Sequence, residues 1–479
     1  SRMNCGACER VCPFHGPCTA SACRQSYVRW AEPASTTTGV ELAIVAENPE
    51  GYLLAAGVAP SALSIGGASR PVAGESAFVA RFGPGGVVDW VRIAEPSPFV
   101  AVLGVGSTGD RVYVVGTFVE RMAVDSDVVA IGPTGRVAAY VWELGIDGAS
   151  RSMSVITSTG SVTVTAVAAA DDGGVHVAGH FSGEIAVDGG TPRASQGIVD
   201  AFLVHRTGGG AVNVQAWGVE GGRVRATGLV ATPSGAVVVG GDYNARFAIG
   251  ASSLSAPVGD DDVWIAQIEP AGEASFVHFA GGPRPDRLMA LAADATGAVY
   301  FHAGFAPARE PDEEAGLRRA TFPVAGSVGR SSVLGAFHSG SGSSRWVRAL
   351  DPGAITYRGT LTLVRVPSSR LAVHGTGRLY LLTEARDGDS LEDDAVLSVE
   401  AGAGVTLIGL SSVDGSLRWA RVFRGSEEIR AIGLGAARFG ELGLGLHHRG
   451  TASLSDHEFS PPGGSGVVVA RIGEELPRL

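Results

Sequence analysis

The sequence predicts an all-β fold, a seven-bladed β-propeller that is closed by a strand from its own N-terminus. Three observations predict it: a unit of about 62 residues recurs seven times, each unit holds about four short β-rich runs, and the last unit lacks its final strand. Short runs separated by Gly, Pro, Asp and Ser are typical of strands joined by tight turns. One small sheet cannot bury both faces alone but can do so between two neighbours, so we expect the units to close radially.

The clearest repeat is a short apolar run that follows a turn, as in DRVYVVGTF and GGVHVAGHF. Its equivalent positions lie 59, 63, 62, 62, 80 and 63 residues apart, at Leu53, Val112, Val175, Val237, Val299, Leu379 and Leu442. The next run carries a large residue at intervals of 62, at Phe78, Tyr140, Phe202 and Trp264. The run after that opens with a large apolar residue, at Trp90, Phe276, Trp346 and Trp419. Helical spacing is absent over any useful length, so these runs are expected to be strands.

The N-terminus supplies the strand that the seventh unit lacks. The run Tyr27 to Pro33, YVRWAEP, matches WVRIAEP at Trp90 to Pro96 and has no blade before it, whereas the seventh unit ends at GVVVARIGEELPRL without such a strand. Pairing the two closes the ring and removes an exposed sheet edge, which would otherwise invite aggregation. We therefore expect two parts, a cysteine-rich segment over 1–24 and the propeller over 25–479.

Charge and hydropathy exclude some partners. The formal net charge is -11, and all 37 basic residues are arginine. An acidic body without a basic stripe is a poor ligand for nucleic acid or for anionic lipid, because both depend on clusters of cations. No apolar stretch approaches the roughly 18 to 20 residues that span a bilayer, so membrane insertion is not expected.

All five cysteines lie near the N-terminus, at Cys5, Cys8, Cys12, Cys18 and Cys23. Such a cluster indicates either a small disulfide knot in an oxidising compartment or a metal site. CGACERVCP contains the last three ligand positions of a bacterial ferredoxin run, but Arg2 stands where the first cysteine should be. A zinc site from the first three cysteines and His15 is the other alternative, although its spacing matches no strong zinc pattern. We favour two intrachain disulfides, because the surrounding residues offer no second shell for a metal.

The whole run, with pattern C-x2-C-x3-C-x5-C-x4-C, resembles the cysteine-rich segments of secreted bacterial surface proteins and lipoproteins. The resemblance implies an extracellular or outer cell-surface location and a further cysteine upstream of Ser1. The odd cysteine would then pair outside this chain, in an intermolecular disulfide, or with that upstream residue.

The blades carry the motifs STGDRVYVVGTF and ADDGGVHVAGHF, the latter followed by VDAFLVHRTGGG. They resemble the bacterial seven-bladed β-propeller repeat family over residues 27 to 479, most closely in blades one to four. That family is defined by its fold, and the resemblance implies architecture without an activity.

Aligning the units gives one candidate binding site. Counting back from the turn before the second strand reaches the start of each innermost strand, at Glu41, Val100, Thr163, Arg225, Arg287, Pro367 and Arg430. Innermost strands line the central channel, so Arg225, Arg287 and Arg430 would face one mouth of it and bind a carboxylate, sulfate or sugar acid. The alternative is that each arginine pairs with an acidic residue of the neighbouring blade.

Two acidic loops are weaker candidates. Asp387, Asp389 and Asp393, with Glu392 and Asp394, could supply oxygen ligands to calcium, as could the Asp260–Asp262 run. Neither stretch fits the spacing of a known calcium loop, so no cofactor is expected. SVDGSLRW at Ser412 to Trp419 has the form of an Asp-box, but we expect a plain turn in which Asp414 accepts backbone hydrogen bonds.

Two classes of function remain. The first is an extracellular or cell-surface binding or scaffold propeller, tethered by the cysteine-rich segment, that presents variable loops to a protein or an acidic glycan. The second is an enzyme, a polysaccharide lyase or glycoside hydrolase, which needs a base or a carboxylate pair at the channel mouth. The predicted inner strands, such as AVLGVGS and VTAVAAAD, offer almost only small apolar side chains there. We therefore favour binding without catalysis.

Overall fold

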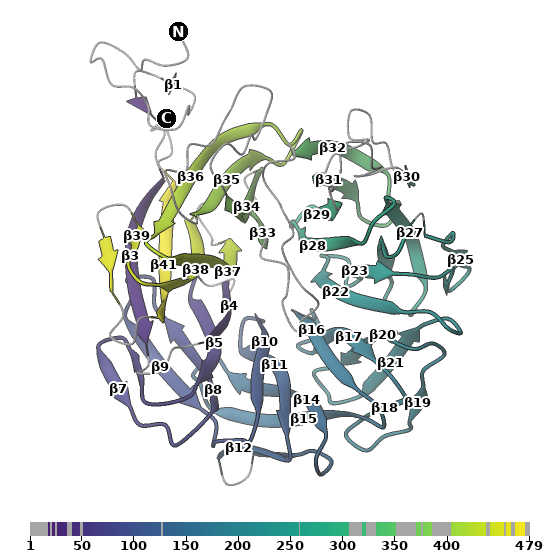
Figure 1. Cartoon of the computed structure of the whole chain (residues 1–479), viewed down its shortest axis with the longest axis horizontal. Coiled ribbons are helices and arrows are strands. Elements are labelled where there is room, and N and C mark those ends of the chain that lie inside the picture. Colours follow the sequence, from purple (N-terminus) through teal and green to yellow (C-terminus); the bar gives the residue numbers. More distant parts are fainter. Residues whose placement is uncertain are drawn as a thin grey trace.

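The protein is a seven-bladed β-propeller in which the sheets surround a central axis (Figure 1). The computed structural model describes residues 18–19, 22–23, 26–35, 41–47, 51–125, 128–257, 259–305, 319–321, 332–350, 370–374, 377–385, 404–436, 441–454, 457–460 and 465–474. Its elements within these ranges are all strands. Accordingly, the described residues contain no helix that is long and apolar enough to cross a membrane. The predicted fold class is confirmed.

Each blade is an antiparallel sheet whose strands run outward from the channel in chain order. The inner strands are β4 (Glu41–Glu47), β10 (Val100–Ser107), β16 (Val162–Ala169), β22 (Val224–Ala231), β28 (Asp286–Ala293), β33 (Arg370–His374) and β37 (Glu428–Ala436). The second strands are β5 (Leu53–Ala59), β11 (Arg111–Val119), β17 (Val175–Phe181), β23 (Val237–Tyr243), β29 (Ala298–Phe305), β34 (Arg378–Ala385) and β38 (Glu441–Arg449). The third strands are β8 (Ser76–Phe82), β14 (Val137–Gly145), β20 (Asp200–Arg206), β26 (Asp262–Ile268), β31 (Ser332–His338), β35 (Gly404–Ser411) and β41 (Ser465–Glu474). The outer strands are β9 (Val88–Ile93), β15 (Ser150–Ser158), β21 (Val212–Trp217), β27 (Ala274–Gly281), β32 (Ser344–Leu350), β36 (Leu417–Gly425) and β3 (Ser26–Ser35).

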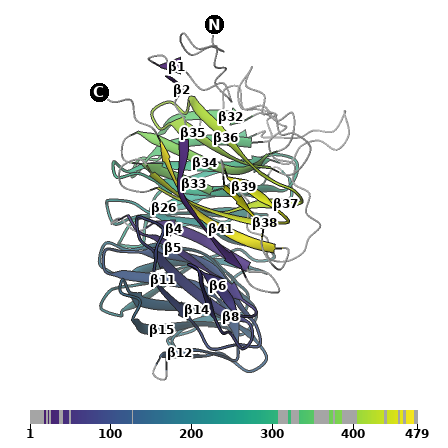
Figure 2. The ribbon, with the colours of Figure 1, turned by 90° about the vertical axis from the view of Figure 1, so that its left-hand side faces the viewer.

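The N-terminal strand closes the ring as predicted. β3 pairs antiparallel with β41 from Ser26 opposite Glu474 to Ser35 opposite Gly466, and Figure 2 shows the purple β3 beside the yellow β41. The inner strand of blade seven, β37, contacts the inner strand of blade one, β4, so the ring is continuous. Closure leaves no blade without its outer strand among the described residues.

The sequence match that revealed the closing strand was wrong in register by three residues. Trp30, and not Tyr27, takes the place of Trp90, because Trp30 lies opposite Arg471 as Trp90 lies opposite Arg81. The indole Nε1 of Trp30 donates to Pro84 O at 2.9 Å, just as that of Trp90 donates to the turn of the next blade. VR and AEP occur in both runs, but aligning these letters places Tyr27 on Trp90, three residues away from the structurally equivalent Trp30. The repeated letters therefore explain the error.

Short inserted strands lie between the second and third strands and cover neighbouring sheet edges. They are β6 (Leu63–Ile65), β7 (Ala68–Arg70), β12 (Arg121–Asp125), β13 (Val128–Ile131), β18 (Glu184–Val187), β19 (Arg193–Ala194), β24 (Ala248–Ile249), β25 (Ser252–Ser253), β30 (Arg319–Ala320), β39 (Ala452–Leu454) and β40 (His457–Phe459). β6, β18, β30 and β39 each pair with the outer strand of the preceding blade, namely β3, β15, β27 and β36. These pairings blunt edges that could otherwise recruit another chain. A separate hairpin, β1 (Cys18–Thr19) with β2 (Ala22–Cys23), precedes the ring.

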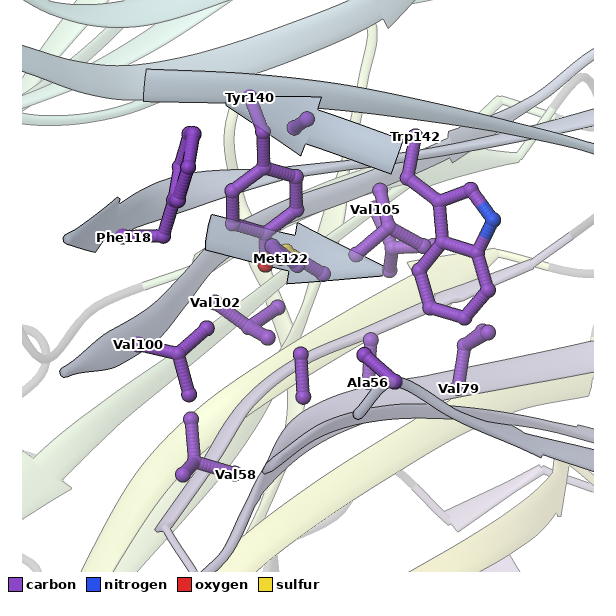
Figure 3. Close-up of a cluster of buried hydrophobic side chains, with 14 of the residues drawn as sticks. Ala56, Val58, Val79, Val100, Val102, Val105, Phe118, Met122, Tyr140 and Trp142 are labelled. Atoms are coloured by element: carbon purple, nitrogen blue, oxygen red, sulfur yellow. The ribbon is translucent and has the colours of Figure 1, made fainter. Parts of the chain in front are cut away.

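The hydrophobic core lies between adjacent blades. At the interface of blades one and two, Ala56 and Val79 of blade one pack against Val102, Tyr140 and Trp142 of blade two (Figure 3). Every one of these residues is buried. Each blade therefore buries its two faces against its two neighbours, which is why the unit must repeat and close.

A glycine beneath a large aromatic ring explains the most regular part of the repeat. Tyr140 lies opposite Gly116, and its hydroxyl donates to Ala101 O of the inner strand at 3.2 Å. A Cβ on Gly116 would come within 1.8 Å of that carbonyl oxygen. The same pairing joins glycine to an aromatic residue in blades one, three and four, as Gly57 with Phe78, Gly179 with Phe202 and Gly241 with Trp264.

Candidate functional site

The three predicted arginines lie near the start of inner strands, at one end of the channel. Arg225 of β22 pairs with Asp242, Arg287 of β28 with Gly304, and Arg430 of β37 with His447. Blade two differs from the sequence count by one residue. Ala101, and not Val100, lies opposite Thr117 at this level, because the turn after β10 is one residue shorter. Pro367 of blade six lies outside the described residues.

Arg225 and Arg287 come together across the interface of blades four and five. Both donate from Nη1 to Oδ2 of Asp242, at 3.2 and 3.1 Å. Arg287 also reaches Asp261 Oδ2 at 3.2 Å, and Asp261 Oδ1 accepts from Nη2 of Arg223 at 3.3 Å. The five side chains form a continuous chain of alternating charge, Arg225, Asp242, Arg287, Asp261, Arg223, which we call the charge chain.

The charge chain exposes its cations and buries its anions. The side chains of Arg223, Arg225 and Arg287 are 38%, 26% and 25% exposed, whereas those of Asp261 and Asp242 are 7% and 3% exposed. Burial raises the pKa of Asp242, although Arg287 and Arg225 oppose this rise. Within the charge chain, three partly exposed guanidinium groups face two buried carboxylates, so the cations are the part that a partner can reach.

Arg223 is the residue that the sequence count passed over, because it lies one position before β22 and outside the predicted row. Its Nε is buried without a hydrogen-bond partner. Guanidinium groups carry five donors in a fixed fork, and a single ion pair to Asp261 uses few of them. Among the described residues, Arg223 therefore makes one ion pair, to Asp261, and its fork retains further donors.

The alignment of inner strands also missed the polar residues of the second strands that lie opposite the arginine positions. They occupy the fifth position after the repeat valine or leucine, at Thr117, His180, Asp242 and His447. Burial, and next the nearby Arg225, lowers the pKa of His180 to about 4, although a hydrogen bond to the backbone of Ala226 opposes the shift. His180 is therefore a neutral group at physiological pH. The same repeat alignment, applied to the second strands, would have found this row.

Arg430 stands apart from the charge chain. It pairs with Glu428 on its own strand, and in the described part of the chain no carboxylate is shared between it and Arg225 or Arg287. Its neighbour His447 has a pKa lowered by burial and then by Arg430. The structure thus brings two of the three predicted arginines together. Ligand binding by Arg225, Arg287 and Arg430 stays a prediction.

The other candidate sites are mostly outside the described residues. Asp387, Asp389 and Asp393 fall there, as do Cys5, Cys8 and Cys12, so calcium binding and the disulfides remain predictions. For Cys18 and Cys23 the backbone alone is described, in the β1–β2 hairpin, where the two residues lie directly opposite each other. Within the described part of the chain, no group of three or more His, Cys, Asp or Glu side chains could hold a metal ion.

The Asp-box sequence forms the plain turn that was expected. Asp414 Oδ1 accepts from the backbone N–H of Ser416 at 3.1 Å and from its hydroxyl at 2.8 Å. A side-chain hydrogen bond with Ser411, and next these two bonds from Ser416, lower the pKa of Asp414 to about 2. The turn receives the indole of Trp346 from blade five, whose Nε1 donates to Ser412 O at 2.9 Å. Asp414 therefore stabilises a contact between blades.

Comparisons with known proteins bear on the fold alone. No protein-family model matches the sequence, and no curated protein sequence matches it. Among solved structures, the chain is similar to the WD40 domain of Pan2 from Neurospora crassa, with 9% identity and a TM-score of 0.42 over 90% of this chain and 89% of that chain. A likeness at this level carries no information on function. The resemblance to the bacterial seven-bladed repeat family accordingly stays a prediction.

Proposed function

We propose that the protein is a non-catalytic binding or scaffold propeller that presents its channel-mouth face to a protein or an acidic glycan. The charge chain is the observation that carries this proposal. Its three guanidinium groups are partly exposed over two buried carboxylates, in a protein whose formal net charge is -11. An acidic protein that gathers exposed arginines at one place is suited to recognise an anionic group there.

The state of the carboxylates favours binding over catalysis. A lyase or hydrolase needs a base or a pair of carboxylates that can exchange protons with substrate. At the mouth, Asp242 and Asp261 are buried, and each is paired with two arginines. Such carboxylates hold guanidinium groups in place. A polysaccharide lyase or glycoside hydrolase remains the alternative function.

We further propose an extracellular or outer cell-surface location, with the cysteine-rich segment as a tether. The β1–β2 hairpin supports this, because opposed residues in antiparallel pairs have Cα atoms about 4.5 to 5.5 Å apart, within the range that a disulfide bridges. The arrangement of Cys18 opposite Cys23 is thus compatible with one of the two proposed intrachain disulfides.

The proposal is tested by looking for turnover and binding on the same preparation. The full chain is incubated with uronate-containing and neutral polysaccharides, and new reducing ends and unsaturated uronates are measured. We expect no product, and we expect binding to acidic ligands that weakens as salt rises. Sustained product formation that is lost in the Asp242→Asn variant would establish the enzyme alternative instead.

A further inference from the structure

Exposed large apolar side chains are not spread evenly over the propeller. Seven occur among the described residues, and they fall into two groups. Val87 and Val413 sit singly in the turns between third and outer strands, and Val212 begins the outer strand β21, all on the face opposite the charge chain. Phe99, Ile131, Val137 and Ile198, which are 43%, 74%, 38% and 59% exposed, lie on the same face as the charge chain, in the adjacent blades two and three.

Three of these four residues surround the end of β11. Val119, the last residue of β11, pairs with Val137 and donates its N–H to Phe99 O at 3.1 Å. Ile131 precedes Gly132, whose N–H donates to Glu120 O at 2.8 Å, directly after Val119. Phe99, Ile131 and Val137 therefore gather around the end of β11 on blade two. Exposed apolar residues that gather in this way mark interaction sites.

The fourth residue lies beside the charge chain. Ile198 donates its backbone N–H to Gly222 O at 2.8 Å, and the next residue, Val199, forms a bridge with Arg223. Phe99 precedes β10 by one position, as Arg223 precedes β22, so the two occupy equivalent places two blades apart. Equivalent places in a propeller share one face and one distance from the axis. The surface thus runs as an arc over blades two to four.

We propose that this recognition arc, Phe99, Ile131, Val137, Ile198, Arg223 and Arg225, binds a partner protein through a segment in which an acidic side chain lies close to large apolar ones. The inference rests on the proposed function and names the class of partner. Protein interfaces combine aromatic and aliphatic contacts with arginine. The sulfates and hydroxyls of an acidic glycan are polar and would gain no favourable contact from the aliphatic side chains of Ile131 and Ile198. The acidic side chain would accept from Arg223 and Arg225, whose own counter-ions are buried.

The experiment is a selection of random linear peptides displayed on phage against the immobilised full chain. We expect the enriched peptides to carry Asp or Glu within a few residues of a large apolar side chain. One enriched peptide is then synthesised, and its affinity for the variants Phe99→Ala, Ile131→Ala and Arg223→Ala is measured by calorimetry. Each variant should bind at least roughly tenfold more weakly, as expected for residues at the centre of an interface.

Matched controls separate a site from a general loss of structure. Val87→Ala and Val413→Ala remove exposed apolar side chains from the opposite face and should leave the affinity unchanged. Replacing the acidic residue of the peptide by its amide should weaken binding to the native chain more than binding to Arg223→Ala, because the two changes share the contact with Arg223. Thermal melting checks that each variant is folded.

Three results would overturn the inference. These are the absence of any enriched peptide, enrichment of peptides that lack the acidic or the apolar element, and affinities that do not change in the arc variants. Heparin binding that requires Arg223 and Arg225, in the absence of peptide binding, would replace the protein partner with a glycan and leave the proposed function standing. Polysaccharide turnover, by contrast, removes the proposed function itself.

Discussion

Removing the closing strand should destabilise the whole ring. Deleting residues 24 to 34 takes away almost all of β3, which forms nine registered pairs with β41. At a net value of about 0.5 to 1.5 kcal/mol for each backbone hydrogen bond, the lost ladder corresponds to about 4 to 13 kcal/mol. Loss of the Trp30 indole, which stacks on Phe82 with centroids 5.8 Å apart, adds to this. The total is comparable to the whole stability of a typical domain.

The expected shift in melting temperature follows from the size of the protein. With an unfolding entropy of about 2.1 cal/mol/K per residue, a body of roughly 450 residues loses about 1 °C for each kcal/mol. We therefore expect the deletion to lower Tm by about 10 °C in scanning calorimetry and to cause self-association through the uncovered edge of β41, measured by light scattering. A deleted chain that melts within a few degrees of the full chain and stays monomeric would refute the closure argument.

A pair of proline substitutions tests the same strand without deleting it. Pro33 already lies in β3 opposite Val468 and has no N–H, so alternate residues Pro33 and Ala31 direct their backbone groups away from β41. Glu32 has the opposite orientation. Glu32→Pro should therefore lower Tm by several degrees, whereas Ala31→Pro should be tolerated, with Glu32→Ala as the control for the lost side chain. Equal effects of the two prolines would show that the register is wrong.

Three further predictions concern the site, the cysteines and pH. Replacing Arg225, Arg287 and Arg430 together by alanine should abolish binding of an acidic partner. The variant should stay folded with Tm lowered by a few degrees, because buried Asp242 loses both of its counter-ions. Retained binding in a salt titration would exclude these residues. Native protein should contain no stoichiometric iron or zinc and two disulfides within 1–23, and five free thiols by mass spectrometry would contradict this. Burial lowers the pKa of His302 to about 4, so the folded state binds fewer protons than the unfolded state between pH 4 and the ordinary histidine value of 6.5. Stability should therefore fall on acidification through this window, by up to about 3 kcal/mol for this group, and His302→Asn should reduce the pH slope of the denaturant midpoint.

The fold was predictable from the sequence because its strongest constraints are local and repeated. A glycine opposite an aromatic residue marks each of blades one to four, and both residues recur there at nearly constant spacing. Blade five instead pairs Ala303 with Val333, and blade seven pairs Leu446 with Val468. There the ring and the glycine are replaced together, which is the physical reason why the sequence repeat fades in the last blades although the fold continues.

The candidate site was only partly predictable, because its contacts cross between repeats. A count along inner strands finds Arg225 and Arg287, but it cannot show that both share Asp242, which comes from a second strand. Asp261 comes before the third strand, and Arg223 lies just before the inner strand, so neither falls in the row of inner-strand positions that the count follows. The predicted register of β3 was wrong for a related reason. The match of VR and AEP was given more weight than the position of Trp30, and it shifted the alignment by three residues.

Variation at one place in the repeat shows where the fold leaves residues free to serve function. The position held by Arg225 is occupied by Ala101 in blade two, Thr163 in blade three and Arg287 in blade five, and all four pair through backbone groups with the second strand. Because the fold needs only the backbone there, it does not select the side chain. The side chains of blades four and five are nevertheless joined into a chain of alternating charge that places its carboxylates inside and its guanidinium groups outside. A purely structural role would be met by neutral residues such as Ala101 and Thr163, which close the same ring without buried charge. We propose that the burial of Asp242 is retained because it holds two arginines in place for a partner.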